Sequence, residues 1–259
     1  GGIVLGSLIS KFMTDASLPW QAQIWVILVP TVIYAIMFWG QSFPQPKAEA
    51  SSPVANFKAM LNPLYLFMAA CMALTAISEF GPQQWVGPIL AKAGASPMLI
   101  LALVTGLMAV GRYFAGPLVE KLNTAGVLLG SAVFGLLGIY MLSTMSGNML
   151  YVAAIFYALG ICYFWPNMLG YVGQHLPQTG ALGLSIMGGI GMFSSSMFQP
   201  IIGGWIKDNK VTAEASGLVG DAADLAAGQA TLSNMLIFPG ILIVAFALLY
   251  FTGKKKQAA

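Results

Sequence analysis

Long apolar runs dominate this 259-residue sequence and restrict the environments in which it can fold. Hydrophobic residues make up 58% of the chain and charged residues only 7%, whereas about a quarter of the residues in a soluble domain are charged. A transmembrane helix needs ~20 predominantly apolar residues. Seven runs suit that length, at residues 20–43, 63–90, 97–118, 124–145, 149–172, 180–206 and 231–252. The sequence therefore predicts an all-α, polytopic membrane helix bundle, with the lipid bilayer as its main partner.

A hydrophilic stretch at residues 44–62, rich in Pro, Ser and Ala, divides the chain into two parts. Such a composition is typical of a linker. Residues 1–43 precede it and hold one complete span, together with an N-terminal apolar piece that is too short to cross a bilayer. We interpret that piece as the end of a truncated helix and the chain as part of a longer protein. Six spans follow the linker, so residues 63–252 are expected to form a six-helix transmembrane domain, with a tail at 253–259.

Basic residues near the ends of the spans indicate the orientation in the membrane. Seven of them share one side with the linker, against four on the other side. The seven are Lys47, Lys58, Arg112, Lys121, Lys254, Lys255 and Lys256, and the four are Lys11, Lys92, Lys207 and Lys210. The positive-inside bias therefore places the linker and the tail in the cytoplasm and a loop at residues 207–230 outside.

The six spans after the linker differ in a pattern with a period of three. Runs interrupted by Pro or rich in Gly occur at 63–90, which contains Gly81 and Pro82, at 149–172 and at 180–206. The third and sixth runs carry little polar chemistry and are expected to be lipid-facing supports. The pattern predicts two three-helix repeats of opposite topology, in which the first helix of each is broken near mid-membrane to line a cavity.

A cluster of charged residues lies between two of these spans, within the stretch GRYFAGPLVEKLN at 111–123. The cluster predicts a short, solvated turn. Its spacing of glycine, acid and base resembles the signature of the cytoplasmic turn between the second and third helices of a six-helix half in the major facilitator superfamily. Leu122, Asn123 and Thr124 replace the glycine and paired basic residues that follow in that family. The alternative is an ordinary interfacial turn. The residues of this cytoplasmic gate motif would be Gly111, Arg112, Gly116, Glu120 and Lys121.

Three segments extend the resemblance, namely EFGPQQWVGPIL at 79–90, GLMAVGRYFAGPLVEKL at 106–122 and FQPIIGGWIKD at 198–208. Together they are similar to the C-terminal half of a major facilitator transporter, nearest to the bacterial sugar:proton symporters of the fucose permease-like branch. The resemblance implies twelve helices in two halves. This chain would hold the C-terminal six-helix half and the last helix or so of the N-terminal half. The resemblance also implies a bacterial inner (plasma) membrane location and, as a partner, the missing N-terminal half of the same chain.

Glu79 is the only acidic residue well inside a predicted span. An intramembrane carboxylate is costly and faces the bundle interior, so Glu79 is a candidate proton-coupling residue. Its alternative role is a structural hydrogen-bond acceptor at the predicted helix break. Gln83 shares its face one turn farther on, and Gln84 and Trp85 complete a set typical of neutral polyol binding, in which amides lie beside a ring on which a sugar can stack. Trp85 is alternatively an interfacial anchor.

Further polar side chains lie beside prolines in two later spans. Such side chains seldom face lipid, so they point to a cavity and to substrate binding. The candidates are Tyr163, Trp165 and Asn167 around Pro166, and Ser195 and Gln199 before Pro200. Asn167 and Gln199 could equally satisfy backbone groups that the prolines free. Arg112 either snorkels to the interface or pairs with Glu120.

Several classes of protein function lack the residues that they need. An intramembrane enzyme needs paired acids or a His or Ser couple, and one buried acid with a single loop histidine, His175, supplies neither. No lysine is followed by Ser or Thr, as a phosphate-binding loop requires. The basic residues are dispersed apart from the tail, so nucleic-acid binding has no support. Cys71 and Cys162 lie in apolar runs, where a cysteine is ordinarily a small buried hydrophobe, and we expect no metal or other cofactor.

The sequence thus predicts a non-enzymatic secondary active transporter of a small solute. The favoured function is symport of a neutral sugar or polyol with H+ by alternating access, because no Lys or Arg is expected at mid-membrane to meet an anion. The alternatives are an organic anion or metabolite transporter of the same superfamily and a non-transporting structural subunit of the membrane.

Overall fold

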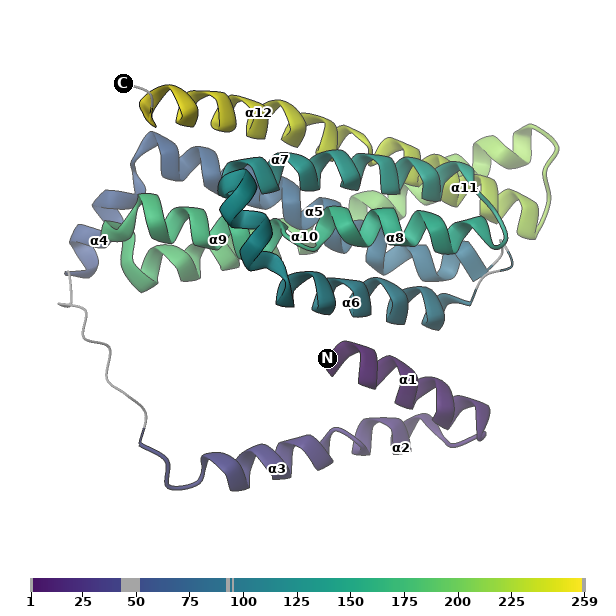
Figure 1. Cartoon of the computed structure of the whole chain (residues 1–259). Helices are drawn as coiled ribbons and strands as arrows, with labels where there is room; N and C mark the ends of the chain where they lie inside the picture. The colour runs from purple at the N-terminus through teal and green to yellow at the C-terminus, as the bar shows by residue number, and fades with distance from the viewer. Residues whose placement is uncertain (1, 43–51, 92–93, 95, 258–259) are drawn as a thin grey trace.

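The computed structural model describes residues 2–42, 52–91, 94 and 96–257, and helix is the only regular secondary structure among them (Figure 1). The first four helices are α1 (Gly2–Asp15), α2 (Trp20–Trp25), α3 (Leu28–Phe38) and α4 (Pro53–Met60). The others are α5 (Pro63–Ala91), α6 (Pro97–Tyr113), α7 (Ala115–Thr144), α8 (Met149–Ile161), α9 (Phe164–His175), the 3-10 helix η1 (Pro177–Thr179), α10 (Gly180–Ala215), α11 (Asp221–Asn234) and α12 (Ile237–Gln257).

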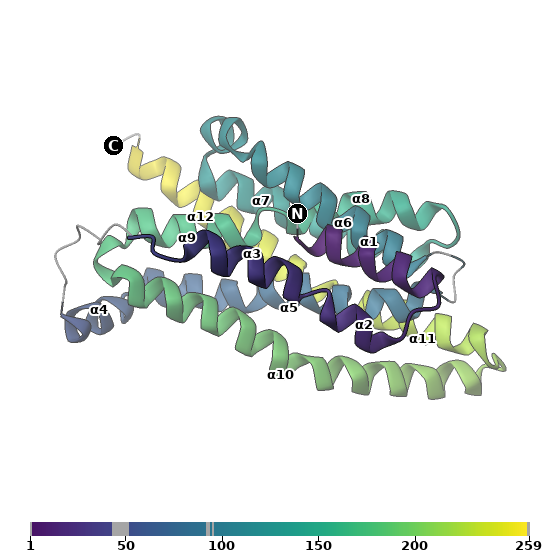
Figure 2. The same cartoon turned by 90° about the horizontal axis from the view of Figure 1, so that it is seen from below.

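Helices α5 to α12 form one elongated bundle, and α1 to α3 lie along one side of it (Figures 1 and 2). α1 packs against α6, whereas neither α2 nor α3 buries a residue. α5 is central, because it contacts α6, α8, α9, α10, α11 and α12. Side chains at the middle of α5 can therefore meet groups from most of the bundle.

Six helical segments of the described chain are long and apolar enough to cross a membrane. They are Trp20–Phe38, Pro63–Trp85, Ala115–Thr144, Met149–His175, Pro177–Ala215 and Asp221–Gly253. The remaining predicted span, 97–118, is shorter than expected, because α6 ends at Tyr113 after 17 residues. The chain is an integral, multi-pass membrane protein built from helices, as its apolar runs predict.

Prolines divide three of the helical segments at the same relative position. The helix is interrupted at Val26–Ile27 before Pro30, at Cys162–Tyr163 before Pro166, and at Met235–Leu236 before Pro239. Each interruption begins four residues before the proline, where the missing N–H leaves a carbonyl without its donor and the proline ring crowds that carbonyl. The break predicted in the span 149–172 is thus confirmed, and the span 231–252 contains one that was not predicted.

The break predicted at Gly81 and Pro82 is wrong, because α5 is continuous from Pro63 to Ala91. α10 likewise runs without interruption through Pro200. A proline therefore does not decide alone whether a membrane helix breaks. Neighbouring groups that replace the lost hydrogen bond also matter.

The segment 111–123, predicted as a turn, is mostly helical. α6 ends at Tyr113, and α7 begins two residues later. Asn123, at φ 55° and ψ 168°, interrupts α7, and its side-chain oxygen accepts a hydrogen bond from the Gly126 N–H at 2.9 Å. The apolar part of α7 thus begins at an asparagine cap, next to the predicted start of the span at residue 124.

The loop predicted at 207–230 is also wrong for most of its length. α10 continues to Ala215, and α11 begins at Asp221. The segment is rich in alanine, the strongest helix former, and the ion pair between Lys210 and Asp224, at 2.7 Å, joins the two helices. Only a short connection is left between them.

Of the predicted linker 44–62, the first part lies outside the described residues. The part from residue 53 onward forms α4, whose Asn56 and Met60 are buried. α4 packs against η1 and α10. This end of the linker is therefore anchored to the bundle, and its cytoplasmic location stays a prediction.

α12 has two faces that differ in exposure. Apolar side chains at spacings of three and four residues are exposed along one face, namely Ile237, Ile241, Val244, Leu248 and Phe251. The opposite face is buried and consists of Phe238, Leu242, Phe246 and Leu249. An exposed stripe this apolar suits contact with lipid.

Candidate functional site

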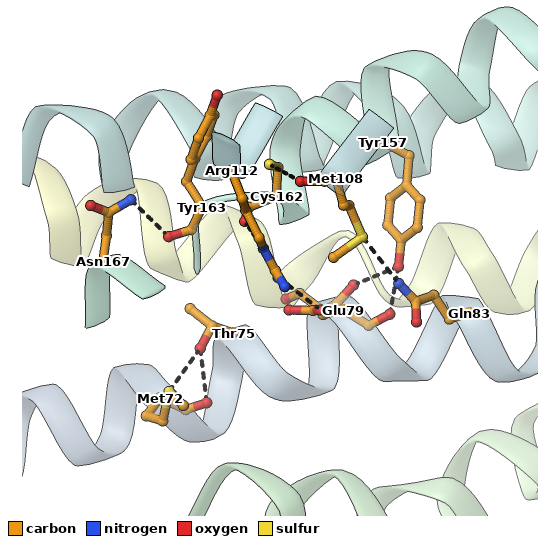
Figure 3. Close-up of polar contacts among 11 residues, drawn as sticks. Met72, Thr75, Glu79, Gln83, Met108, Arg112, Tyr157, Cys162, Tyr163 and Asn167 are labelled. Carbon is orange, nitrogen blue, oxygen red and sulfur yellow. Dashed lines mark hydrogen bonds and ion pairs between the residues drawn. The ribbon is translucent and has the colours of Figure 1, made fainter. Parts of the chain in front are cut away.

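Polar side chains inside the bundle gather around the middle of α5 (Figure 3). They come from α5, from the last turns of α6, from α8, and from the break between α8 and α9. Figure 3 shows Glu79 and Gln83 of α5 opposite Met108 and Arg112 of α6, with Tyr157 of α8 beside them. We call Glu79, Gln83, Met108, Arg112 and Tyr157 the α5 polar cluster.

Glu79 is the acidic group of the cluster, and its side chain is buried, with the residue 4% exposed. Its Oε1 atom lies 3.8 Å from Nη2 of Arg112. Its Oε2 atom is buried and has no hydrogen-bond partner in the described part of the chain. An unpartnered buried carboxylate oxygen costs free energy unless it carries a proton or meets a ligand.

Arg112, which faces Glu79, makes a second contact at the break between α8 and α9. Its Nε donates a hydrogen bond to the carbonyl oxygen of Cys162 at 2.8 Å. That carbonyl is four residues before Pro166, so no backbone N–H of α9 is available to it. The guanidinium thus supplies a donor to the helix break and places positive charge beside the middle of α5, while its own side chain is 41% exposed.

This arrangement corrects two expectations about Arg112. It pairs with Glu79 and not with Glu120, which is exposed on the first turns of α7. The guanidinium also lies beside the middle of α5, where the sequence, in favouring a neutral substrate, placed no Lys or Arg. Sequence position alone placed Arg112 at the end of its span, but its long side chain reaches inward to the break.

Tyr157 supports α5 where Pro82 interrupts the helical hydrogen bonds. Pro82 has no N–H for the carbonyl of Ser78, four residues before it. The Tyr157 hydroxyl lies 3.2 Å from that carbonyl oxygen and 2.6 Å from the carbonyl oxygen of Glu79, and it can donate to either. A side chain of α8 therefore replaces the lost helical bond.

A second group of predicted residues meets between α5 and α10. The indole Nε1 of Trp85 donates to Oε1 of Gln199 at 2.8 Å, and Nε2 of Gln199 donates to the carbonyl oxygen of Phe80 at 3.3 Å. The Phe80 ring packs edge-on against Trp165, with centroids 5.8 Å apart. Ser195 is buried one turn before Gln199 on α10. Trp85 is therefore a hydrogen-bonded helix contact within the bundle.

The remaining predicted site residues do not meet at one place. Gln83 Nε2 lies 3.9 Å from the sulfur of Met108, and Gln84 is exposed. The Tyr163 hydroxyl donates to the carbonyl oxygen of Gly111 at 3.0 Å. Asn167 Nδ2 donates to the carbonyl oxygen of Tyr163 at 3.0 Å. Asn167 and Gln199 thus both bond backbone carbonyls. Neither carbonyl is the one that Pro166 or Pro200 leaves without its helical donor, so the structural alternative stated for these residues is not the one observed.

The predicted gate motif is divided between two places. Arg112 belongs to the α5 polar cluster, where it pairs with Glu79. The carbonyl oxygen of Gly111, next to it in the chain, accepts a hydrogen bond from the Tyr163 hydroxyl. Gly116, Glu120 and Lys121 are exposed at the start of α7. The motif residues therefore do not form one local cluster.

Two groups of this site, the Tyr157 hydroxyl and the Cys162 carbonyl, were not predicted from the sequence. Tyr157 lies inside a continuous apolar run and has no local signal of its own. The Cys162 carbonyl could have been found in the sequence, because it lies four residues before Pro166 and therefore lacks its helical N–H donor. Within the described residues, no group of three or more His, Cys, Asp or Glu side chains could hold a metal ion.

Comparisons of the chain with protein-family models, with curated proteins and with solved structures found no match.

Proposed function

We propose that this chain is the C-terminal half of a secondary active transporter of the major facilitator type, which moves a small solute by alternating access coupled to H+. The observation that carries the proposal is the state of Glu79. Its carboxyl group is buried near the middle of a membrane helix, and one oxygen faces Arg112 while the other has no partner among the described residues. Acidic groups in such positions serve as proton relays in transporters.

The pair can exist in two states that differ in charge. When Glu79 is ionised, the Arg112 guanidinium compensates the carboxylate. When Glu79 is protonated, its Oε2 hydroxyl is neutral and Arg112 is left with an uncompensated charge. A substrate that binds one state better than the other shifts the protonation equilibrium, and by reciprocity the proton changes substrate affinity by the same factor.

A neutral sugar or polyol is the first candidate for the solute. Amide groups and indole rings lie around α5, with Gln84 exposed and Gln199 hydrogen-bonded to Trp85. Sugars are bound by amides that donate and accept hydrogen bonds and by aromatic rings that stack on their apolar faces.

An organic anion is the second candidate, and Arg112 is the observation that favours it. Its side chain is 41% exposed although it lies beside the buried Glu79. Guanidinium groups bind carboxylates through parallel hydrogen bonds, so an anionic substrate could take the place of Glu79 when that residue is protonated.

The decisive experiment uses the full-length protein in proteoliposomes with an imposed pH gradient. Glu79→Gln is expected to retain substrate exchange but to lose accumulation driven by the gradient. The matched control is Glu214→Gln, which changes an exposed acid near the end of α10, outside the predicted gate motif, and should leave both activities unchanged. Accumulation by the Glu79→Gln protein that still responds to pH would refute the proposed role of Glu79.

The substrate class is tested by competition for uptake. Neutral polyols and small carboxylates are compared as inhibitors with the wild type and with Arg112→Gln. Loss of carboxylate inhibition in Arg112→Gln would select the anion, whereas polyol inhibition that survives in this variant would select the sugar. Absence of any saturable uptake by the full-length wild type would instead favour a structural membrane subunit.

A further inference from the structure

A cavity of about 140 Å³ lies between α5, α6, α7 and α8, on the side of Gln83 away from Arg112. Its deep wall is apolar and fully or almost fully buried. The residues that form it include Ile100 and Val104 of α6, Leu142 of α7, and Ala154 and Tyr157 of α8. Gln83 of α5 also lines it.

The volume of the cavity indicates the size of an occupant. An apolar cavity of about 150 Å³ in another protein stays dry and binds benzene or xenon. A single six-membered ring is the size of occupant that this volume admits. A sugar ring of similar size would leave its hydroxyl groups unpaired against the apolar wall, which costs free energy for each group.

The polar groups that line the cavity limit which hydrogen bonds an occupant can form. The Tyr157 hydroxyl is occupied by the carbonyl oxygens of Ser78 and Glu79. The Gln83 amide is held more weakly, because the acceptor of its Nε2 is the thioether sulfur of Met108, 3.9 Å away. Thioether sulfur is a poor acceptor, so the Gln83 amide can form a better hydrogen bond with a ligand.

We propose that this cavity binds a compact apolar ring that carries one hydrogen-bonding substituent, with the ring against Val104 and Ala154 and the substituent on the Gln83 amide. Phenol is the simplest molecule of this class. The inference goes beyond solute transport and does not rest on the proposed roles of Glu79 and Arg112, which do not line the cavity, although the cavity shares Gln83 and Tyr157 with the α5 polar cluster.

The test uses fluorine NMR on the full-length protein in nanodiscs, with 4-fluorophenol and fluorobenzene as probes. Both probes are expected to bind saturably and to compete for one site. Gln83→Leu leaves an apolar side chain of similar size but removes the amide, so it should weaken 4-fluorophenol binding about five-fold, as the loss of one hydrogen bond does, and leave fluorobenzene binding unchanged. An equal effect on both probes, or no effect, would refute the role of Gln83.

Filling the cavity provides the second arm. Val104→Phe places a ring in the space and should abolish saturable binding of both probes. The matched control is Leu137→Phe, which adds a ring on an exposed face of α7 and should leave binding unchanged. Should Val104→Phe fail to fold, Ala154→Val fills part of the same space and should weaken both probes. Undiminished binding in a folded filling variant would place the probes elsewhere, in the bilayer or on the surface, and would overturn the proposal.

Discussion

The hydroxyl of Tyr157 lies 2.6 Å from the backbone carbonyl oxygen of Glu79 and joins α8 to α5 where Pro82 interrupts the helical hydrogen bonds. The same hydroxyl is 3.2 Å from the carbonyl of Ser78, which has no N–H donor at Pro82. One side chain thus supports the backbone that carries the buried acid. The position of Glu79 depends on a residue 78 positions away in the sequence.

Tyr157→Phe should destabilise the protein, because it leaves the Ser78 carbonyl without a donor in an apolar interior. The expected loss is about 1–3 kcal/mol of unfolding free energy. Denaturant titration in detergent micelles measures it. Tyr140→Phe is the control, because Tyr140 is 55% exposed and its loss of a hydroxyl should have little effect. Equal stabilities of the two variants would contradict the role assigned to Tyr157.

Arg112→Gln should destabilise the protein by about 2 kcal/mol. Removing one partner of a fully buried ion pair costs about 3–5 kcal/mol, and the cost here is smaller because Arg112 is partly exposed. The double variant Arg112→Gln/Glu79→Gln should be more stable than the sum of the two single effects predicts, by at least about 0.5 kcal/mol. Additive effects in this cycle would show that the two side chains do not interact.

Gly160→Ala should be strongly disruptive, because an added Cβ would collide with the backbone nitrogen and Cα of Gly135 across the α7–α8 interface. Overpacking of this kind costs about 1–3 kcal/mol or more. Gly130→Ala is the matched control on α7, where a Cβ would meet nothing within 4 Å. That change should be neutral or stabilising by up to about 1 kcal/mol. Thermal unfolding of both variants in the same detergent measures the difference, and similar shifts would contradict close backbone packing at Gly160.

The predicted orientation can be tested by labelling single cysteines from outside intact cells. Ser216→Cys, in the exposed connection between α10 and α11, should react with an impermeant maleimide. Ser52→Cys, exposed before α4, should be protected until the membrane is permeabilised. The native Cys71 and Cys162 are buried and should remain unlabelled. The reverse pattern would invert the topology and place the start of α7 outside.

The helices and the membrane location were readable from the sequence, because they depend on local properties. A run of ~20 apolar residues can satisfy its backbone in lipid only by internal hydrogen bonds, so its length and composition are sufficient to predict a span. The break before Pro166 was predicted from local chemistry, since a proline lacks the N–H that the carbonyl four residues before it needs, but the same rule wrongly predicted a break at Pro82. The burial of Glu79 was also predictable, since a single charge inside an apolar run is expected to face the bundle interior.

Only the tertiary structure decided what the polar groups meet. Pro82 and Pro166 have the same local chemistry, and in both cases a side chain from another helix lies within hydrogen-bond distance of the freed carbonyl, Tyr157 at the first and Arg112 at the second, yet α5 continues and α8–α9 breaks. Helical periodicity tells which residues share a face of one helix, but it does not tell which helix lies opposite that face. Arg112 therefore looked like an interfacial residue in the sequence. The packing of α6 against α8 and α5 made it the partner of Glu79.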